Sequence, residues 1–428
     1  MNVLFKGIDL LTMTSEGFLH NVNVAVADGK IAYVGKGMPT GLLTQKVVSG
    51  QDKLLMPGLV NAHTHLPMVA MRGYAGDMNL QKWLFDMIFP VEAKWDEECI
   101  EIATKLAICE SLASGTTSVS DMYFFLEGMA RAVSDSGIRA NLSRGLSLSE
   151  GEDAEEKVAD ALDFIKRYDN TEDGRLKADL GVHAEYTSSP ELWRAVADAY
   201  AREPHCIQIH LSETESEHEA CKQKYGATPT ALLDSYGLIT ADTLCAHGVY
   251  LEEGDMDILA ARGASVAHCP MSNLKLGSGV ARVPKLIGKG INLAIGTDGA
   301  SSNNNTDMFA EMKIAALLQK GLCRDPEAVS AKEILSAATV GGGRAQGRDV
   351  GCIEAGRPAD LVLLDTGSAE MFPALEPYSA AVYSAGPSSV IMTMVDGNVL
   401  YEKGEFKSLD REKLKAEFKT KVIPKLYL

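Results

Sequence analysis

Short apolar runs alternate with longer segments of helical period through the middle of this 428-residue chain. The runs are rich in β-branched and small residues, as strands are, whereas the segments between them repeat apolar side chains every three or four residues. Eight such runs occur, at 59–65, 117–122, 138–145, 178–185, 206–213, 243–249, 264–270 and 291–298. Alternating strands and helices indicate a parallel sheet of the α/β class. Eight repeats predict a closed (β/α)8 barrel of the TIM type, whose active site lies at the C-terminal ends of the strands.

The two ends of the chain have a different pattern. Residues 1–56 contain short strands with turns, as in "NVNVAVADGKIAYVGKG", and the segments 357–365 and 389–404 repeat this style. We therefore expect the ends to pair in one small β-sandwich domain, made of 1–56 together with 346–428. The barrel would then occupy 57–345. Such a division suits a chain of this length, which exceeds the size of one simple core.

The charge of the chain argues against two classes of partner. There are 41 basic and 58 acidic side chains, which gives a formal charge of −17. This charge repels phosphate backbones and anionic lipid head groups, so we expect neither nucleic acid nor a membrane surface as a partner. The first residues lack the basic and apolar stretches of a secretory signal, which predicts a cytoplasmic protein. The eight cysteines are scattered without CxxC pairs, as expected for reduced residues.

Most of the predicted strands carry a polar residue near their C-terminal end. Burying a polar group in a barrel costs roughly 2–7 kcal/mol unless the group is paired or binds a metal. A large number of polar residues at one end of the barrel is therefore not expected by chance. These residues are His63, His65, Asp121, Arg144, His183, His210, Glu213, His247 and Asp298. The phasing predicts a polar site at that end of the barrel.

The first two of these residues are histidines with one residue between them. Residues two apart in a strand point to the same side, so His63 and His65 can reach one ion from the strand end. Alone, the pair would fit two hydrogen-bonded core histidines equally well. Together with His210 and Asp298 it predicts a site of three histidines and one carboxylate. Such ligands suit zinc or a similar divalent metal, which lowers the pKa of bound water to about 7.

Two further residues fit the transfer of protons at such a site. Glu213 follows His210 by three residues and could carry a proton, and His247 could hold or polarise the attacking water. The alternatives are a surface carboxylate for Glu213 and a hydrogen-bonded core histidine for His247. The neighbouring carboxylates of "SETESEHE", at 215, 217 and 219, are predicted to lie on the surface.

Several segments together resemble a known family. They are "PGLVNAHTHLPM", "HLSET", "CAHGV", "VAHCPMSNLKLGSG" and "IGTDGASSNNNTDMF". They are similar to the amidohydrolase superfamily, and within it to the metal-dependent aminohydrolases that include methylthioadenosine/S-adenosylhomocysteine deaminases. The resemblance covers essentially the whole chain. Cys269, Ser272 and Asn273 resemble a family loop that shapes the site.

The resemblance implies roles for the residues that match. The metal ligands would be His63, His65, His210 and Asp298, the catalytic residues Glu213, His247 and Asp298, and the substrate-binding residues Glu92, Arg144, His183, Glu213 and Asp298. Without the family, Glu92 could equally cap a helix and Arg144 could form an ion pair at the barrel rim. No lysine ends the fourth strand to bridge a second metal, so the family pattern implies one divalent metal per subunit, with Zn²⁺ favoured and Fe²⁺ as the alternative.

The implied activity is hydrolytic deamination of an adenine nucleoside with a 5′-thioether, namely 5′-methylthioadenosine or S-adenosylhomocysteine. A carboxylate such as Glu92 can accept two hydrogen bonds from a sugar diol, which favours a nucleoside over a free base. A related enzyme acting on guanine, cytosine or a triazine-like heterocycle is the alternative, followed by a barrel that only binds. The apolar segment 68–90 could form a lid or ordinary packing, and the sequence leaves a homo-oligomer open.

Overall fold

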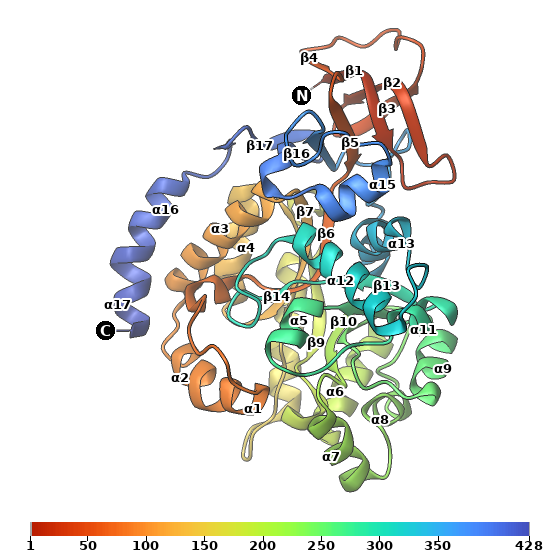
Figure 1. The fold of residues 1–428 in the computed structure, drawn as a ribbon. Coiled ribbons are helices and arrows are strands. Elements are labelled where there is room, and N and C mark those ends of the chain that lie inside the picture. Colours follow the sequence, from red (N-terminus) through yellow and green to blue (C-terminus); the bar gives the residue numbers. More distant parts are fainter. Residues whose placement is uncertain (1, 428) are drawn as a thin grey trace.

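A computed structural model describes residues 2–427, which form a parallel barrel with a smaller β domain above it (Figure 1). The first strand of the barrel pairs with the second, and each later strand pairs with the one before it, up to β13. The barrel strands are β6 (Leu59–His65), β7 (Thr116–Tyr123), β8 (Arg139–Arg144), β9 (Leu176–Val182), β10 (Ile207–Leu211), β11 (Thr243–His247), β12 (Ser265–His268), β13 (Asn292–Ile295) and β14 (Asp298–Gly299). The predicted barrel is confirmed.

The eighth strand differs from its predicted form, because it is interrupted after Ile295. Its first part, β13, pairs with β12, whereas its second part, β14, pairs with β6 and so closes the ring. The step between them passes very close to β6: a Cβ on Gly296 would lie 2.7 Å from the carbonyl oxygen of His63. Only glycine fits there, since that contact is shorter than real Cβ atoms make.

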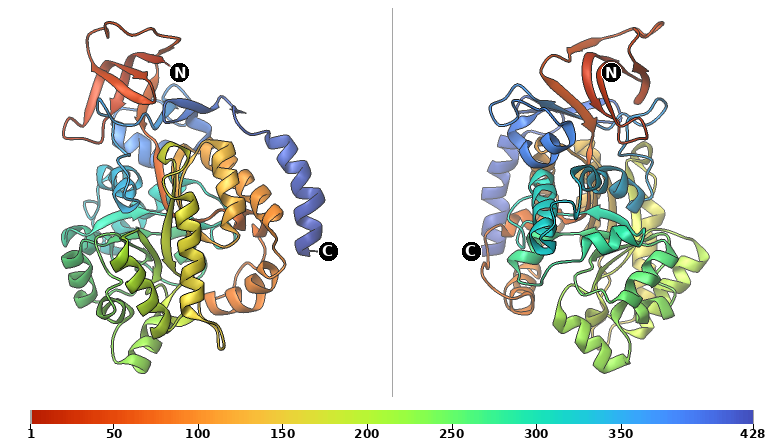
Figure 2. Two further views of the ribbon diagram at one scale, coloured as in Figure 1. Left: turned by 180° about the vertical axis from the view of Figure 1, so that it is seen from behind. Right: turned by 45° about the vertical axis from the view of Figure 1, so that its right-hand side comes forward.

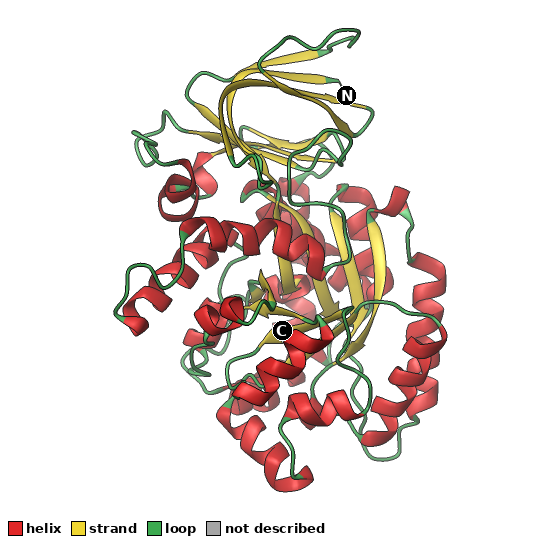
Figure 3. Ribbon diagram, turned by 90° about the vertical axis from the view of Figure 1, so that its right-hand side faces the viewer, coloured by secondary structure: helices red, strands yellow, loops and turns green. Residues whose placement is uncertain are grey.

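Helices surround the barrel, as Figure 3 shows. They follow the strands in the order that a βα repeat requires. The helices are η1 (Leu66–Met71), α1 (Leu80–Lys82), η2 (Trp83–Ile88), α2 (Phe89–Glu92), α3 (Glu97–Ala113), α4 (Leu126–Ser136), α5 (Ala154–Tyr168), η3 (Glu172–Gly174), η4 (Glu185–Thr187), α6 (Pro190–Arg202), α7 (Glu215–Tyr225), α8 (Pro229–Ser235), α9 (Glu253–Arg262), α10 (Pro270–Lys275), α11 (Val283–Gly288), α12 (Met308–Cys323), α13 (Ala331–Ser336), η5 (Ala337–Gly341) and α14 (Gly342–Ala345).

The two chain ends pair with each other, as the sequence predicts. The strands are β1 (Val3–Leu11), β2 (Phe18–Ala27), β3 (Lys30–Gly35), β4 (Lys46–Ser49), β5 (Lys53–Pro57), β15 (Leu361–Asp365), β16 (Val390–Val395), β17 (Asn398–Glu402) and β18 (Glu405–Phe406). They are joined in the order β18-β17-β16-β15-β5-β1-β2-β3, with β4 beside β1. This single mixed sheet curls around a core to which both ends contribute, including Phe5, Val24, Leu363 and Met394 (Figure 3).

The last helices leave this sheet and run down the side of the barrel (Figure 2). The short helices α15 (Pro377–Ser379), η6 (Ala380–Ser384) and η7 (Pro387–Ser389) precede β16, and α16 (Arg411–Glu417), η8 (Phe418–Val422) and α17 (Ile423–Tyr427) follow β18. α16 and η8 contact α3. Lys421 and Lys425 form ion pairs with Glu98 and Asp96 at the start of that helix. The last part of the chain therefore packs against the barrel, and the domain limits drawn from the sequence remain a prediction.

A buried ion pair ties the barrel to the small domain. Arg139, at the start of β8, donates from Nε to Oδ2 of Asp360 at 2.6 Å and from Nη2 to Oδ1 of Asp360 at 3.1 Å. The same Nη2 also contacts Asp396 at 3.0 Å. Arg139 is 5 % exposed and Asp360 is 3 % exposed. Removing one partner would leave the other charge buried without compensation.

We expect Arg139→Met to lower the free energy of unfolding by about 3–5 kcal/mol, because Asp360 would stay buried and unpaired. Arg262→Met is the matched control, since Arg262 forms a two-contact ion pair with Asp234 on the surface. That loss should be about 0.2–1 kcal/mol. Urea denaturation followed by circular dichroism measures both, and equal losses for the two variants would contradict the argument.

Candidate active site

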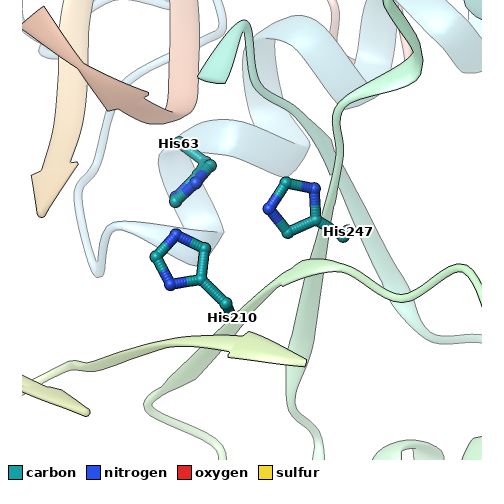
Figure 4. A group of neighbouring side chains, drawn as sticks. All are labelled: His63, His210 and His247. Atoms are coloured by element: carbon teal, nitrogen blue, oxygen red, sulfur yellow. The ribbon is translucent and has the colours of Figure 1, made fainter. Parts of the chain in front are cut away.

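The three predicted metal-binding histidines and the predicted catalytic histidine, His247, converge at the C-terminal ends of the barrel strands. His63 and His65 come from β6, His210 from β10 and His247 from β11, and all four are buried. Figure 4 shows the rings of His63, His210 and His247 pointing toward a common space. Their centroids lie 4.8 Å apart for His63 and His210, and 5.5 Å apart for His210 and His247.

Asp298 completes this cluster from β14. Its Oδ1 lies 3.2 Å from Nε2 of His65 and 3.5 Å from Nε2 of His63. Its Oδ2 accepts hydrogen bonds from the hydroxyls of Ser272 at 2.5 Å and Ser302 at 2.8 Å. Burial raises the pKa of Asp298, but the facing rings of His63 and His65 outweigh burial and hold it well below the usual value. One carboxylate oxygen is thus fixed by hydroxyls, and the other faces the histidines.

Hydrogen bonds from the Nδ1 atoms of His65 and His210 determine that Nε2 of each ring faces the centre of the cluster. His65 Nδ1 lies 2.6 Å from the carbonyl oxygen of Met122, and His210 Nδ1 lies 2.6 Å from that of His183. A carbonyl oxygen only accepts, so each Nδ1 carries a proton, and in its neutral form each ring presents the lone pair of Nε2 inward. These two Nε2 atoms are 3.3 Å apart. Two lone pairs repel at that distance unless a cation or proton lies between them.

The electrostatics of the cluster also favour a cation. Burial lowers the pKa of His65, but the hydrogen bond and the charge of Asp298 outweigh it and raise the pKa to about 9. Burial lowers the pKa of His63 to about 4, and its Nε2 is buried without a hydrogen bond. Donor atoms of His63, His65 and Asp298, and likewise of His63, His210 and His247, lie within 4.8 Å of one another. Imidazole nitrogens and a carboxylate in this arrangement fit a divalent metal of the zinc type.

Glu213 and His247 face each other beside this cluster. His247 Nε2 lies 3.6 Å from Oε2 of Glu213, and Oε1 of Glu213 contacts the hydroxyl of Ser278 at 3.3 Å. His247 Nδ1 is 2.9 Å from Oδ1 of Asn273, which leaves Nε2 free to accept a hydrogen bond. Burial raises the pKa of Glu213, which suits a group that takes and gives a proton near neutral pH.

A cavity of about 590 Å³ opens above these side chains. Its polar lining includes the predicted residues His65, Glu92, His183, His210, Glu213, His247 and Asp298. Part of its apolar wall comes from the segment 68–90: Met68, Leu80, Trp83, Leu84, Phe85 and Phe89. The cavity therefore joins a polar floor to an apolar wall, and a closing motion of that wall remains a prediction.

Glu92 and His183 also line this cavity, and the ring of His183 lies 4.9 Å from that of His210. Oε1 of Glu92 accepts a hydrogen bond of 2.5 Å from the hydroxyl of Tyr123. Burial raises the pKa of Glu92 to about 7, although this hydrogen bond lowers it. His183 Nδ1 is 2.8 Å from the hydroxyl of Thr187, and burial, helped by the charge of His65, lowers the pKa of His183 to about 4. His183 therefore offers a neutral ring to a bound molecule.

Arg144 is the predicted substrate-binding residue that the structure does not bring into the cavity lining. It ends β8 and is half-buried, and its Nε is buried without a hydrogen bond. Its neighbour Gly145 lines the cavity instead. The contact of Arg144 with a substrate accordingly remains a prediction from the sequence.

The sequence reasoning missed the side chains that hold the site in place. Ser272 and Asn273, expected to shape the site, contact Asp298 and His247, but the hydroxyls of Ser278 and Ser302 were not singled out. The signal for Ser302 is the run of small polar residues "SSNNN" at 301–305, shortly after Asp298, whereas Ser278 lies in "KLGSG" at 275–279. Asp121, recognised only as a polar strand end, accepts a hydrogen bond of 2.7 Å from the backbone of Leu66 and so fixes the turn after His65.

One prediction from the sequence is wrong. Glu217, expected on the surface with Glu215 and Glu219, is buried and only 3 % exposed. The start of α7 turns its side chain back under the end of β10, where backbone N–H groups take the place of water as its partners. An acidic run does not reveal from its sequence which of its members points inward.

Comparison with known proteins agrees with this architecture. Residues 54–400 match the model of the amidohydrolase family. The chain belongs to the amidohydrolase family. It is 41 % identical over 420 residues, 97 % of each chain, to a 5-methylthioadenosine/S-adenosylhomocysteine deaminase of Pelotomaculum thermopropionicum. It is also 40 % identical, over 96 % of each chain, to a 5′-deoxyadenosine deaminase of Methanosarcina barkeri.

A solved structure has the same fold over the whole chain. An adenosine deaminase of Xanthomonas campestris with bound zinc superposes with a TM-score of 0.93 at 34 % identity, over 100 % of this chain and 99 % of that one. The predicted family, fold and class of enzyme are thus confirmed. Across residues 2–427, no helix has the length and apolar character needed to cross a membrane.

We expect the purified chain to bind one zinc per subunit, and His63→Ala and His210→Ala to reduce that content below about one tenth, because each removes a buried nitrogen donor. His205→Ala is the control, since His205 lies outside both donor groups. Elemental analysis by mass spectrometry after desalting measures the ratio. Full zinc content in both site variants would rule out these ligands.

Proposed function

We propose that this chain is a hydrolytic deaminase of adenine nucleosides with a 5′-thioether, such as 5′-methylthioadenosine and S-adenosylhomocysteine. The observation that carries this proposal is the position of Glu92 on the same cavity as the metal donors and Glu213. A carboxylate there can accept both hydroxyls of a ribose while the base lies over the polar floor. The relatives named as deaminases of such nucleosides support the same substrate class.

The metal ligands in this proposal are His63, His65, His210 and Asp298. The orphaned Nε2 of His63 and the inward lone pairs of His65 and His210 support this assignment, with Zn²⁺ favoured and Fe²⁺ as the alternative. A divalent metal held there supplies a nucleophilic water at neutral pH by lowering its pKa to about 7. Everything else in the reaction is the work of the side chains around it.

The side chains around the metal site control where the two protons of the attacking water go. The oxygen of water adds to C6 of the adenine ring, and Glu213 transfers one proton of that water to the ring nitrogen N1. His247 Nε2 accepts a hydrogen bond from the attacking water, which orients it. The second proton of the water leaves with the C6 amino group as ammonia, so the product is the corresponding inosine derivative. General acid–base help of this kind is worth roughly 10²- to 10⁴-fold in rate.

The apolar wall suits the rest of the substrate. Met68, Leu84 and Phe89 are apolar side chains of the kind that pack against a thioether. We also propose the cytoplasm as the location, in keeping with the sequence, and the nucleoside as the small-molecule partner. A free base or triazine substrate would leave Glu92 without a role.

We expect the zinc-loaded protein to release ammonia from 5′-methylthioadenosine, S-adenosylhomocysteine and 5′-deoxyadenosine, and much more slowly from adenine, guanine and cytosine. Treatment with a chelator should abolish this activity, and added zinc should restore it. A coupled glutamate dehydrogenase assay measures ammonia. Turnover of a free base alone would refute the nucleoside assignment.

We expect Glu92→Gln to lower kcat/KM for these nucleosides by about 10- to 100-fold, because a hydrogen bond to a charged group is worth roughly 1.5–3 kcal/mol. Activity toward any free base should change less than about threefold. Tyr123→Phe is the matched control, since it removes only the hydroxyl that bonds Glu92. An equal loss on nucleosides and bases would mean that Glu92 does not bind the ribose.

A further inference from the structure

The buried carboxylate of Glu217 has no part in the reaction as described, yet it holds the turn that carries Glu213. Its Oε1 accepts the backbone N–H of Ser212 at 2.9 Å. Its Oε2 accepts the N–H of Glu213 at 2.7 Å and that of Thr214 at 3.3 Å. Three consecutive backbone donors thus converge on one side chain.

Helix capping alone does not account for these contacts. Thr214 and Glu217 form a capping box at the start of α7, in which the glutamate accepts the N–H of the capping residue. The chain contains a matched case at α13, where Ser330 and Glu333 form the same motif. Glu333 is exposed, and it accepts only from the N–H and hydroxyl of Ser330. The additional contacts of Glu217 reach the two residues before the cap.

The same turn also fixes the segment that follows His247. The carbonyl oxygen of Ser212 accepts N–H groups of Val249 at 3.1 Å and Tyr250 at 3.0 Å. Ser212 has a φ of 48° and His247 a φ of 74°, both in the left-handed region that non-glycine residues seldom adopt. Such backbone persists only where the surroundings hold it. Glu217 is one of the groups that hold it.

We propose that Glu217 is a positioning residue for proton transfer, which fixes the backbone of residues 212–214 so that Glu213 faces His247. This inference rests on the proposed function for its kinetic consequence. Catalytic groups must be held closely in place, because a displacement of about 1 Å can cost about 10²-fold in rate. Glu217 is neither a lining residue of the cavity nor a member of the donor groups, so we expect it to act through the residues that it holds.

Glu217→Gln tests this role with little change of size. The amide oxygen can replace only one of the two carboxylate oxygens, so in either orientation the amide NH₂ group meets a backbone N–H, that of Ser212 or those of Glu213 and Thr214, donor against donor. We expect kcat for 5′-methylthioadenosine to fall about 10- to 100-fold, with KM changed less than about threefold and the zinc content unchanged. Glu333→Gln, which weakens the matched capping box, should keep the wild-type kcat. Equal kcat values for the two variants would overturn the proposal.

A double-mutant cycle then asks whether Glu217 acts through Glu213. In a Glu213→Gln background, adding Glu217→Gln should lower kcat by less than about threefold, because the group being positioned is already disabled. A full further loss in that background would overturn the proposal. Should Glu217→Gln not fold, Glu217→Asp keeps the carboxyl group on a shorter side chain, and it should lower kcat at full zinc content.

Amide hydrogen exchange gives a readout that needs no substrate. In Glu217→Gln, peptides that cover 212–214 and 248–250 should exchange faster than in the wild type, and those that cover 331–333 should not. Unchanged exchange at 248–250 would refute the link to His247. If the wild type released no ammonia from any nucleoside, the proposed function would fail, while the exchange result would still decide whether Glu217 holds both turns.

Discussion

The site depends on how the barrel closes. The two-residue strand β14 pairs with the end of β6, which sets Asp298 opposite Thr64 and Gly299 opposite His65. Asn61 secures the approach, because it accepts the N–H of Thr297 at 3.0 Å and donates to the hydroxyl of Thr297 at 2.7 Å. The closure brings the first and last strands of the barrel together, and with them His63, His65 and Asp298. The break in the eighth strand thus sets the carboxylate beside two of the histidines.

Neighbouring side chains offset the free-energy cost of burying Asp298 and of its backbone conformation. Asp298 is buried, and its φ of 60° is one that non-glycine residues seldom adopt. Two serine hydroxyls fix one of its oxygens, and the other faces two imidazole rings. His65, His210 and His247 each have their outer nitrogen held by a carbonyl or amide oxygen. The inward-facing atoms of Asp298 and of these three histidines therefore have their direction set by partners on the outer side.

The sequence predicts the barrel and its donors well for a physical reason. The end of a strand determines where its side chain lies, so His63, His65, His210 and His247 could be located from strand phasing alone. The partners of these residues come from loops, whose course follows no period. For that reason Ser278 and Ser302 were missed. Glu217 was assigned to the surface because an acidic helix start does not show which side chain turns inward, and Arg144 ends a strand, yet its side chain does not line the cavity in which it was expected.

The reacting centre and the substrate wall belong to different parts of the fold. The metal donors sit on the strands, which are hydrogen-bonded into the barrel and resist displacement. The apolar wall sits on the segment after β6, and the far end of the chain braces it: the hydroxyl of Tyr427 donates to the carbonyl oxygen of Ala70 at 3.0 Å, and Nζ of Lys94 donates to that of Leu426 at 2.7 Å. Substitutions in this wall or in α17 can therefore change the choice of substrate. The geometry of the metal donors stays fixed, because no strand of the barrel has to move.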